Sequence, residues 1–364
     1  MSALPIEEPH TRAGLRAMTS RRVAIILFNL GGPDVQEAVR PFLFNLFNDK
    51  AIIGAPQPIR FLIASLISSM RAKSAKAGYA LMGGGSPILP ETMKQAEALE
   101  RAIAQRVDNV TFMCFPAMRY WRPLVREAAR AAEAWGATDA VLLPLYPQFS
   151  TTTTASSRRE WQRVSKLPCS TICCYPTSRG FAQAHADAII TAWRNAGSPA
   201  RPRILFSAHG LPQRVIDSGD PYRWQVEQSA AAIRKLLPSE WDARISYQSR
   251  VGPLKWIGPS TAEEIRRAGA DGVGLVVSPI AFVSEHIETL VELDIEYAQL
   301  AKERQLPFFL RAPALGVTPD FINALADLVE RALAGPGQLQ SENGGRLCPG
   351  AWEMCAQSKG GGAS

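Results

Sequence analysis

The stretch ILFSAHGLP at residues 204–212 decides the fold, because its pattern occurs twice in the chain. An earlier stretch, ILFNLGGP at 26–33, has the same order of parts: an apolar run, a short loop, then glycine and proline before a helical pattern. A buried strand that turns tightly into a helix is typical of the β–α steps of doubly wound sheets. We therefore expect two halves built on the same plan.

Each half contains four short apolar or β-branched runs, and helical patterns separate most of them. The strand candidates are 23–28, 110–115, 140–145 and 170–175 in the first half, and 203–208, 244–249, 272–277 and 308–312 in the second. Continuous apolar strands that alternate with helices predict parallel sheets covered on both faces, which is an α/β fold.

Glycine- and proline-rich connections mark the expected boundaries. The connection AGSPARP (196–202) separates a first domain at 21–198 from a second at 199–335. Residues 1–20 are expected to be a flexible tail, and AGPGQLQSENGG (334–345) leads into a cysteine-bearing extension at 336–364.

Composition indicates a globular protein, with 46% hydrophobic and 20% charged residues among 364. The formal net charge of +7 suits an anionic ligand or an acidic membrane surface. Basic residues are not clustered with aromatic ones, so no nucleic-acid partner is expected. The first twenty residues lack the apolar core of a secretory signal, and a cytoplasmic location is the expectation.

The stretch FVSEHIETLVELDIEY (282–297) carries an acidic line. Glu288, Glu292 and Glu296 recur every four residues, Glu285 extends the line, and His286 stands beside its start. Like charges at this spacing destabilise a helix. One interpretation is a solvated helix face; the other is a functional row of carboxylates.

Two of the four histidines, His209 and His286, come directly after strand candidates of the second half. In parallel sheets the carboxyl ends of strands meet at one edge, where ligands bind. Imidazole beside carboxylate favours metal or proton chemistry, although the spacing is not that of a zinc site. One histidine and one carboxylate would hold a divalent ion loosely, as suits a metal in transit.

Three loops have both a structural and a functional interpretation. NLGGP (29–33) and MGGGSPI (82–88) are either tight turns or places where the backbone approaches a flat ligand. Arg119 and Tyr120 follow a strand, either as a packed helix start or as a wall for a planar anionic ligand.

Five segments together resemble the ferrochelatases, in the same order as in that family. They are MRYWRP (118–123), YPQFSTTTTASS (146–157), FSAHGLP (206–212), QSRVGPLKWIGPST (248–261) and SPIAFVSEHIETLVELDIEY (278–297). The resemblance extends from about Val23 to about Leu333 and is highly specific in its histidine loop and acidic helix.

This resemblance implies insertion of Fe²⁺ into protoporphyrin IX with release of two protons, the terminal step of haem synthesis. It implies two Rossmann-like domains, each with a four-stranded parallel sheet, and porphyrin in the cleft between them. His209 and Glu288 match the catalytic, metal-contacting pair. The remaining matches are a metal or proton relay at Glu285, His286, Glu292 and Glu296, and porphyrin contacts at Leu30, Tyr79, Ser86, Arg119, Tyr120 and Phe282.

Two alternatives remain open at this point. One is a chelatase for coproporphyrin III, or for another metal or tetrapyrrole. The other is a haem- or metal-binding protein without catalysis. The sequence does not predict the oligomeric state.

IRFLIASLISSMRAKSAK (59–76) combines an apolar helical pattern with four basic residues. Its apolar part is too short to span a bilayer. It is expected either to pack on the first domain or to meet the inner face of the membrane peripherally.

The cysteines raise the question of an iron–sulfur cofactor. Some ferrochelatases hold a [2Fe–2S] cluster with cysteines of a C-terminal extension, and Cys348 and Cys355 stand in such an extension here. Cluster-bearing bacterial relatives have a further cysteine where this chain has Gln357. Cys173 and Cys174 would complete a set of four, although strand alternation would place them on opposite faces. The alternative is an extension that has lost its cluster.

Overall fold

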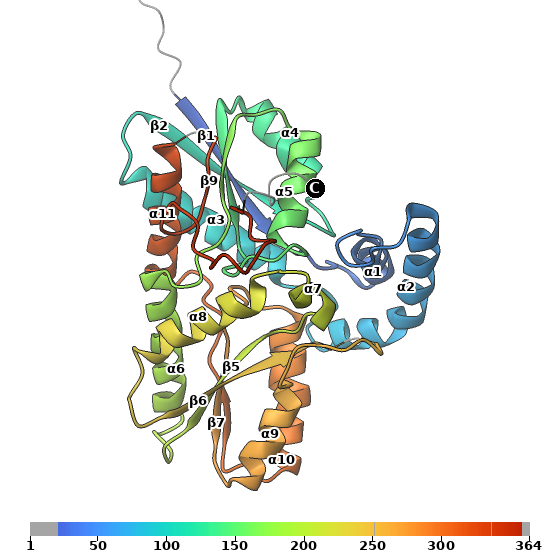
Figure 1. Ribbon diagram of the computed structural model, residues 1–364, viewed down its shortest axis with the longest axis vertical. Coiled ribbons are helices and arrows are strands. Elements are labelled where there is room, and N and C mark those ends of the chain that lie inside the picture. The colour runs from blue at the N-terminus through green and yellow to red at the C-terminus, as the bar shows by residue number, and fades with distance from the viewer. Residues whose placement is uncertain (1–20, 251, 336, 359–364) are drawn as a thin grey trace, which may run out of the picture.

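The structure is a computed structural model that describes residues 21–250, 252–335 and 337–358. The expected flexible tail at 1–20 lies outside the described residues. Two parallel sheets form the core, with helices on both faces, so the predicted α/β fold is confirmed (Figure 1). All eight strand candidates are strands.

The first sheet has the strand order β2-β1-β3-β4-β9, and the second has the order β6-β5-β7-β8. The strands of the first sheet are β1 (Arg21–Asn29), β2 (Val110–Met118), β3 (Asp139–Pro144), β4 (Cys169–Ile172) and β9 (Leu339–Gln340). Those of the second are β5 (Arg203–His209), β6 (Asp242–Gln248), β7 (Leu275–Pro279) and β8 (Phe309–Arg311).

The first sheet therefore has five strands and not the expected four. The added strand, β9, comes from the C-terminal extension and pairs in parallel with β4. The Thr171 amide donates to the Gln338 carbonyl at 2.8 Å, and the Cys173 amide donates to the Gln340 carbonyl at 2.7 Å. Without these bonds β4 would present an unpaired edge, which the extension covers.

Helices surround both sheets. They are α1 (Val39–Phe47), α2 (Gln57–Ala80), α3 (Ile88–Ala104), α4 (Val125–Trp135), α5 (Thr154–Val164), α6 (Arg179–Asn195), α7 (Gln213–Asp217), α8 (Tyr222–Arg234), α9 (Thr261–Ala270), α10 (Ala298–Glu303) and α11 (Pro319–Leu333). A 3₁₀ turn at Gln36–Ala38 precedes α1, and a π-helix at Glu288–Tyr297 precedes α10.

Strand β1 shows why both faces are covered. Val23, Ile25 and Leu27 join a core formed with α3 and α11, whereas the alternate residues Ala24 and Ile26 join a core formed with α4 and α5. Side chains of a strand point alternately to its two faces, so an unbroken apolar run needs a layer of helix on each side.

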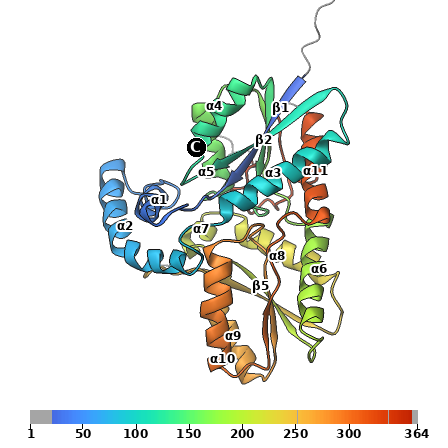
Figure 2. The same cartoon turned by 180° about the vertical axis from the view of Figure 1, so that it is seen from behind.

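The chain crosses between the two sheets more than the sequence boundaries imply. Helix α6, expected within the first domain, packs on the second sheet, where Ile189 shares a core with Phe206. Helix α11, expected within the second domain, packs on the first sheet through Phe321 and Leu325. Figures 1 and 2 show α6 and α11 along the same side of the molecule, where they tie the two units together.

Helices α1 and α2 project from the first unit as an arm (Figure 1). They pack on each other, and the ring of Phe61 stands edge-on to that of Phe44 at 5.2 Å. Leu62, Leu66 and Met70 lie on the outer side of α2 and are 68%, 62% and 72% exposed. Among the described residues, no helix has the length and apolar character needed to cross a bilayer.

Candidate active site

The carboxyl end of β5 and the start of the π-helix bring His209 and Glu288 together. His209 is the last residue of β5, and its Nδ1 lies 3.2 Å from Oε2 of Glu288. The same carboxylate oxygen lies 3.4 Å from Nε2 of His286. One carboxylate oxygen therefore stands between two imidazole rings, as the strand-end argument predicted for the histidines.

Hydrogen bonding fixes which ring nitrogens can exchange protons. Nδ1 of His286 lies 3.1 Å from the carbonyl oxygen of Ser284, and a carbonyl only accepts, so this nitrogen carries hydrogen. Nε2 of His286 is then the ring nitrogen that faces Glu288. On His209, Nδ1 is engaged with Glu288, which leaves Nε2 as the atom available to a substrate.

The charges of this group stabilise one another. Burial favours a protonated Glu288, but the two neighbouring imidazoles outweigh it and hold the pKa of this carboxyl well below its usual range. Burial also opposes a charged His209, yet Glu288 and, more weakly, Glu292 raise the pKa of its imidazole above the ordinary value. The arrangement favours a carboxylate paired with an imidazole that accepts a proton near neutral pH.

The π-helix places the acidic line in three different surroundings. Glu288 faces the histidines, Glu292 is mostly buried, and Glu296 lies on the exposed end of the helix. A π-helix closes its turn with i→i+5 hydrogen bonds and has a wider turn than an α-helix. Residues four apart therefore stay near one line along its surface.

Glu292 accepts hydrogen bonds from the end of β6, from the residue after it and from the end of the π-helix. Gln248 Nε2 donates to it at 3.0 Å, the Ser249 amide at 2.8 Å, the Ser249 hydroxyl at 2.5 Å and the Tyr297 hydroxyl at 3.0 Å. Burial and the nearby charge of Glu288 nevertheless raise its pKa. Ser249 has φ 64°, a conformation that is rare outside glycine and is often found at functional sites.

Glu285 lies apart from this line. Arg311 Nη1 donates to Glu285 Oε1 at 2.9 Å, and the Ala314 amide donates to the same oxygen at 2.9 Å. Burial opposes the charge, but Arg311 and these hydrogen bonds lower the pKa of Glu285. The Glu285 carboxylate is thus bound to the end of β8 and to the chain beyond it. The sequence alone did not identify Arg311 as its partner.

The first unit meets the π-helix through an apolar cluster. Tyr79, at the end of α2, is buried and packs with Leu30 and with Ile287. Burial, with a smaller contribution from the charge of Glu288, raises the pKa of the Tyr79 hydroxyl above its usual range. The second-unit aromatic Phe282 stands between the histidines, with its ring centre 6.4 Å from that of His209 and 4.5 Å from that of His286.

Arg119 and Tyr120 are tied to an aspartate that sequence reasoning missed. Arg119 Nη2 lies 2.8 Å from Asp49 Oδ2, and the Tyr120 hydroxyl donates to the same oxygen at 2.9 Å. Ser156 donates to this oxygen at 2.7 Å and accepts from Arg119 Nε at 2.8 Å. Tyr120 is 1% exposed, so in this structure it braces Asp49 from within the protein.

The two glycine-rich loops pack against each other. A Cβ added to Gly32 would stand 2.6 Å from Cβ of Ser86, and one added to Gly85 would stand 2.2 Å from the carbonyl oxygen of Asp34. This contact accounts for the glycines by packing within the chain. Ser86 therefore lies beside Gly32, two residues after Leu30.

Comparison with known proteins decides the family. The family model described as Ferrochelatase matches residues 22–333, nearly all of the described chain. The chain belongs to the ferrochelatase family. It is 58% identical to the ferrochelatase of Phenylobacterium zucineum, over 93% of this chain and 99% of the relative. It is 56% identical to that of Caulobacter vibrioides, over 92% of this chain and 97% of the relative.

A distant solved structure shares the fold. A multi-domain protein from Deinococcus radiodurans, described as structurally similar to chelatases, superposes with a TM-score of 0.51 at 16% identity. The superposition covers 89% of this chain and 57% of that chain.

In this ferrochelatase, four cysteines from distant segments gather beside the first sheet. Cys173 and Cys174 have their sulfurs 3.2 Å apart, and Nε2 of Gln225 lies within hydrogen-bonding distance of both Cys174 and Cys348. The neighbouring Cys348 thiol lowers the pKa of Cys355. The predicted separation of Cys173 from Cys174 is wrong, because β4 ends at Ile172 and alternation no longer applies.

A preformed metal site needs several ligating side chains around one point. Within 21–250, 252–335 and 337–358, no three histidine, cysteine, aspartate or glutamate side chains are arranged around one point as a preformed metal site. Around His209, the pair with Glu288 is instead an open arrangement of one imidazole and one carboxylate, with His286 behind it.

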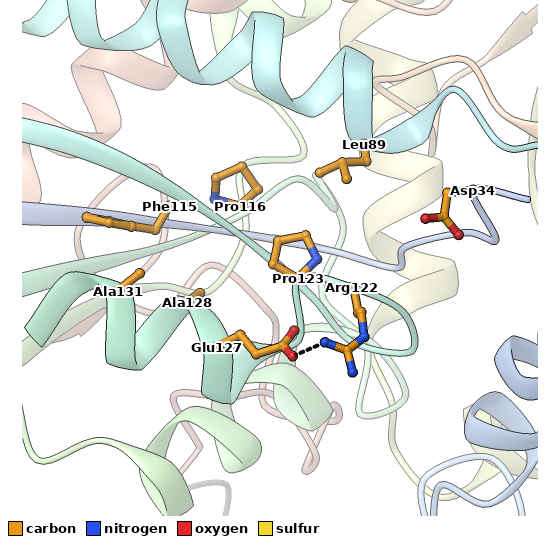
Figure 3. A pocket seen from close by; sticks show the side chains of 9 residues that line it. All are labelled: Asp34, Leu89, Phe115, Pro116, Arg122, Pro123, Glu127, Ala128 and Ala131. Carbon is orange, nitrogen blue, oxygen red and sulfur yellow. Dashed lines mark hydrogen bonds and ion pairs between the residues drawn. The ribbon is translucent and has the colours of Figure 1, made fainter. Parts of the chain in front are cut away.

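A cavity of about 510 Å³ lies elsewhere on the first unit (Figure 3). It follows the outer edge of β2, between Leu89 of α3 and Ala128 of α4, and the ion pair of Arg122 with Glu127 borders it. The histidine pair does not line this cavity.

Proposed function

We infer that this protein is a ferrochelatase, a lyase that inserts Fe²⁺ into a porphyrin in haem synthesis. The family assignment supports the reaction, and the contact of Glu288 with both His209 and His286 is the structural observation that carries it. Fe²⁺ is the substrate metal.

The reaction requires the removal of two pyrrole N–H protons while the metal enters. We propose that Nε2 of His209 accepts the first proton, since Nδ1 already faces Glu288. The carboxylate of Glu288 stabilises the resulting imidazolium, and His286 Nε2 provides the next position for a proton. The same His209–Glu288 pair is the proposed contact for Fe²⁺ as it reaches the ring.

Glu292 and Glu296 continue from this pair toward the exposed end of the π-helix, and we propose that they relay protons or metal. The raised pKa of Glu292 allows it to carry a proton when Glu288 is charged. Glu285 is proposed to support the relay indirectly, since its carboxylate fixes Arg311 and the chain at Ala314.

We propose that porphyrin binds where the two units face each other. Leu30, Tyr79 and Phe282 supply apolar and aromatic surface next to the histidines, with Ser86 on the adjoining loop. Arg119 is a fifth exposed and Tyr120 is buried, so Arg119 is the one of the pair available to a ring carboxylate. The preferred porphyrin is proposed to be protoporphyrin IX.

Haem formation by purified protein tests the function. Anaerobic protein, Fe²⁺ and either protoporphyrin IX or coproporphyrin III should give the iron porphyrin, followed by absorbance. Faster turnover of coproporphyrin III would overturn the substrate preference alone. Absence of turnover with both would overturn the function. His209→Ala should abolish turnover with an unchanged circular dichroism spectrum.

We further propose that the enzyme acts in the cytoplasm with the outer side of α2 against the membrane. The exposed Leu62, Leu66 and Met70 form an apolar strip on the same helix as Lys73 and Lys76. Leu62→Glu should reduce flotation with vesicles that contain phosphatidylglycerol, whereas Leu236→Glu, on an exposed leucine of the second unit, should not. Equal flotation of both variants would contradict this proposal.

A [2Fe–2S] cluster is proposed as a cofactor at the four cysteines. Each iron of such a cluster takes two thiolates, so two pairs, Cys173 with Cys174 and Cys348 with Cys355, suit it better than a single metal ion. When bound, the group would supply a one-electron redox couple.

Anaerobic purification tests the cofactor directly. Wild-type protein should show thiolate-to-iron charge-transfer absorption and contain iron and acid-labile sulfide. Cys348→Ser should lose both, whereas Cys114→Ser, in the core of β2, should keep them. Colourless, active wild-type protein would contradict the proposal.

A further inference from the structure

A single buried glutamine touches both pairs of cysteines. Gln225 lies in the first turns of α8 and is 0% exposed. Its side-chain Nε2 lies 3.1 Å from Sγ of Cys348 and 3.4 Å from Sγ of Cys174. These sulfurs can be no further apart than the sum of the two distances, although one belongs to the first unit and the other to the extension.

The other end of the same side chain fixes its orientation. Oε1 of Gln225 accepts the Phe149 amide at 2.7 Å, so the oxygen points to the first unit and the nitrogen must face the sulfurs. Both N–H groups of the amide are thus directed at sulfur. The side chain of Gln225 therefore reaches across the interface between the units, and the backbone amide of Phe149 sets its orientation.

Neutral thiols are poor acceptors for a fully buried amide. Buried donors are normally satisfied by good acceptors, and hydrogen bonds to charged acceptors are stronger than those between neutral groups. Sulfurs that carry negative charge, as thiolate ligands of iron do, would satisfy this amide far better than thiols.

We propose that Gln225 donates hydrogen bonds to two sulfur ligands of the cluster and raises its reduction potential. This inference rests on the proposed [2Fe–2S] cofactor. Gain of one electron increases the negative charge on the ligand sulfurs, so the donors stabilise the reduced form more than the oxidised form. Hydrogen bonds to sulfur are among the factors that set such potentials.

The same contact makes the potential depend on how the two units meet. Cys174 follows β4 of the first sheet, Cys348 belongs to the extension, and Gln225 is carried by the second unit. Movement of α8 away from Phe149 would withdraw the donors from both sulfurs. Gln225 is therefore a positioning and tuning residue, and no contact with porphyrin is required of it.

Two substitutions at Gln225 separate loss of donors from added charge. Gln225→Glu keeps an oxygen that can accept from the Phe149 amide but replaces the donor by an acceptor. Gln225→Met removes the donors without adding charge. Gln148→Glu is the matched control, because Gln148 is also buried and donates across the same interface, to Ser229 at 2.8 Å and to the Ile280 carbonyl at 3.1 Å.

The readout is the midpoint potential of the whole protein, titrated anaerobically with dithionite and followed by visible absorbance and by electron paramagnetic resonance of the reduced form. At a given applied potential, the ratio of reduced to oxidised cluster should be about tenfold lower in both Gln225 variants than in the wild type. For one electron, this corresponds to a midpoint potential lower by about 59 mV. Gln148→Glu should leave the midpoint close to that of the wild type.

The outcomes distinguish this inference from the cofactor on which it rests. Wild-type protein without iron and sulfide would overturn both. A cluster whose midpoint is the same in the wild type and in Gln225→Met would overturn the role of Gln225 and leave the cofactor in place. An equal shift in Gln148→Glu would also overturn it, because the effect would then follow from the interface in general.

Discussion

Replacing Glu288 by glutamine should change both the rate and the pH dependence of iron insertion. The substitution keeps the shape of the side chain but removes the charge that lies 3.2 Å from Nδ1 of His209. Without that charge the imidazolium formed during turnover is less stable. We expect turnover to fall by about 10²- to 10⁴-fold, the usual contribution of a positioned acid–base group.

The size of the pH effect follows from the geometry. Two unit charges about 4 Å apart interact by about 4 kcal/mol at an effective dielectric constant of 20 and by about 1 kcal/mol in water. His209 is 35% exposed and Glu288 21% exposed, so solvent screens the pair and a value of about 1 to 2 kcal/mol is appropriate. The pKa of His209 should therefore fall in the variant, in which this interaction is lost.

The direction of the change can be read from the acidic limb of kcat/KM. A base acts in its neutral form, and Glu288 raises the pKa of His209, so wild-type activity is lost as the pH falls through that raised value. In Glu288→Gln the acidic limb should move to lower pH.

The matched control is Glu303→Gln, an exposed residue of α10. It should leave both the rate and the limb unchanged. An unmoved limb in Glu288→Gln, or turnover near that of the wild type, would refute the assigned pair.

Two further predictions concern residues that support the site. Tyr222→Phe removes a hydroxyl that donates to the carbonyl of His209 at 3.0 Å. Loss of this hydrogen bond, worth about 1 kcal/mol, should lower kcat by about fivefold with little change in KM. A change in KM alone would contradict this role. Asp49→Asn leaves the mostly buried Arg119 without its charge partner and should reduce the free energy of unfolding by about 2 to 3 kcal/mol. Arg119 and hydrogen bonds lower the pKa of Asp49, so this difference should persist at neutral pH and fade below about pH 3.8; a difference that grows in acid would be contrary to the prediction.

The strands and the edge at which the two histidines gather were predictable because local pattern determines them. Apolar runs such as that of β1 need cover on both faces, and strand ends of a parallel sheet collect at one edge. This argument brought His209, at the end of β5, and His286, beyond the end of β7, to the same edge, whereas the pairing of His209 with Glu288 followed from the resemblance to the ferrochelatases. Sequence also identified the four cysteines that the fold gathers.

Partners that depend on packing between distant segments could not be predicted. Asp49 carries no pattern of its own and reaches Arg119 only because the loop between α1 and α2 lies against the segment that follows β2. Arg311 pairs with Glu285 across the end of β8 in the same way. The exchange of α6 and α11 between the sheets depends on which exposed sheet face each helix covers, and helical periodicity alone does not specify that.

The acidic helix shows how a destabilising pattern can be retained. Glu288 lies against two imidazoles, which stabilise its charge. Glu292 accepts hydrogen bonds from three side chains and one backbone amide, and Glu296 is exposed to solvent. Each carboxylate thus has its own means of stabilisation, and none relies on a neighbouring lysine or arginine of the same helix. Because Glu292 has a raised pKa while Glu288 has a lowered one, adjacent members of the line differ in proton affinity. Such a difference lets a proton rest on Glu292 while Glu288 stays charged, which is the property that a relay next to a proton-releasing reaction requires.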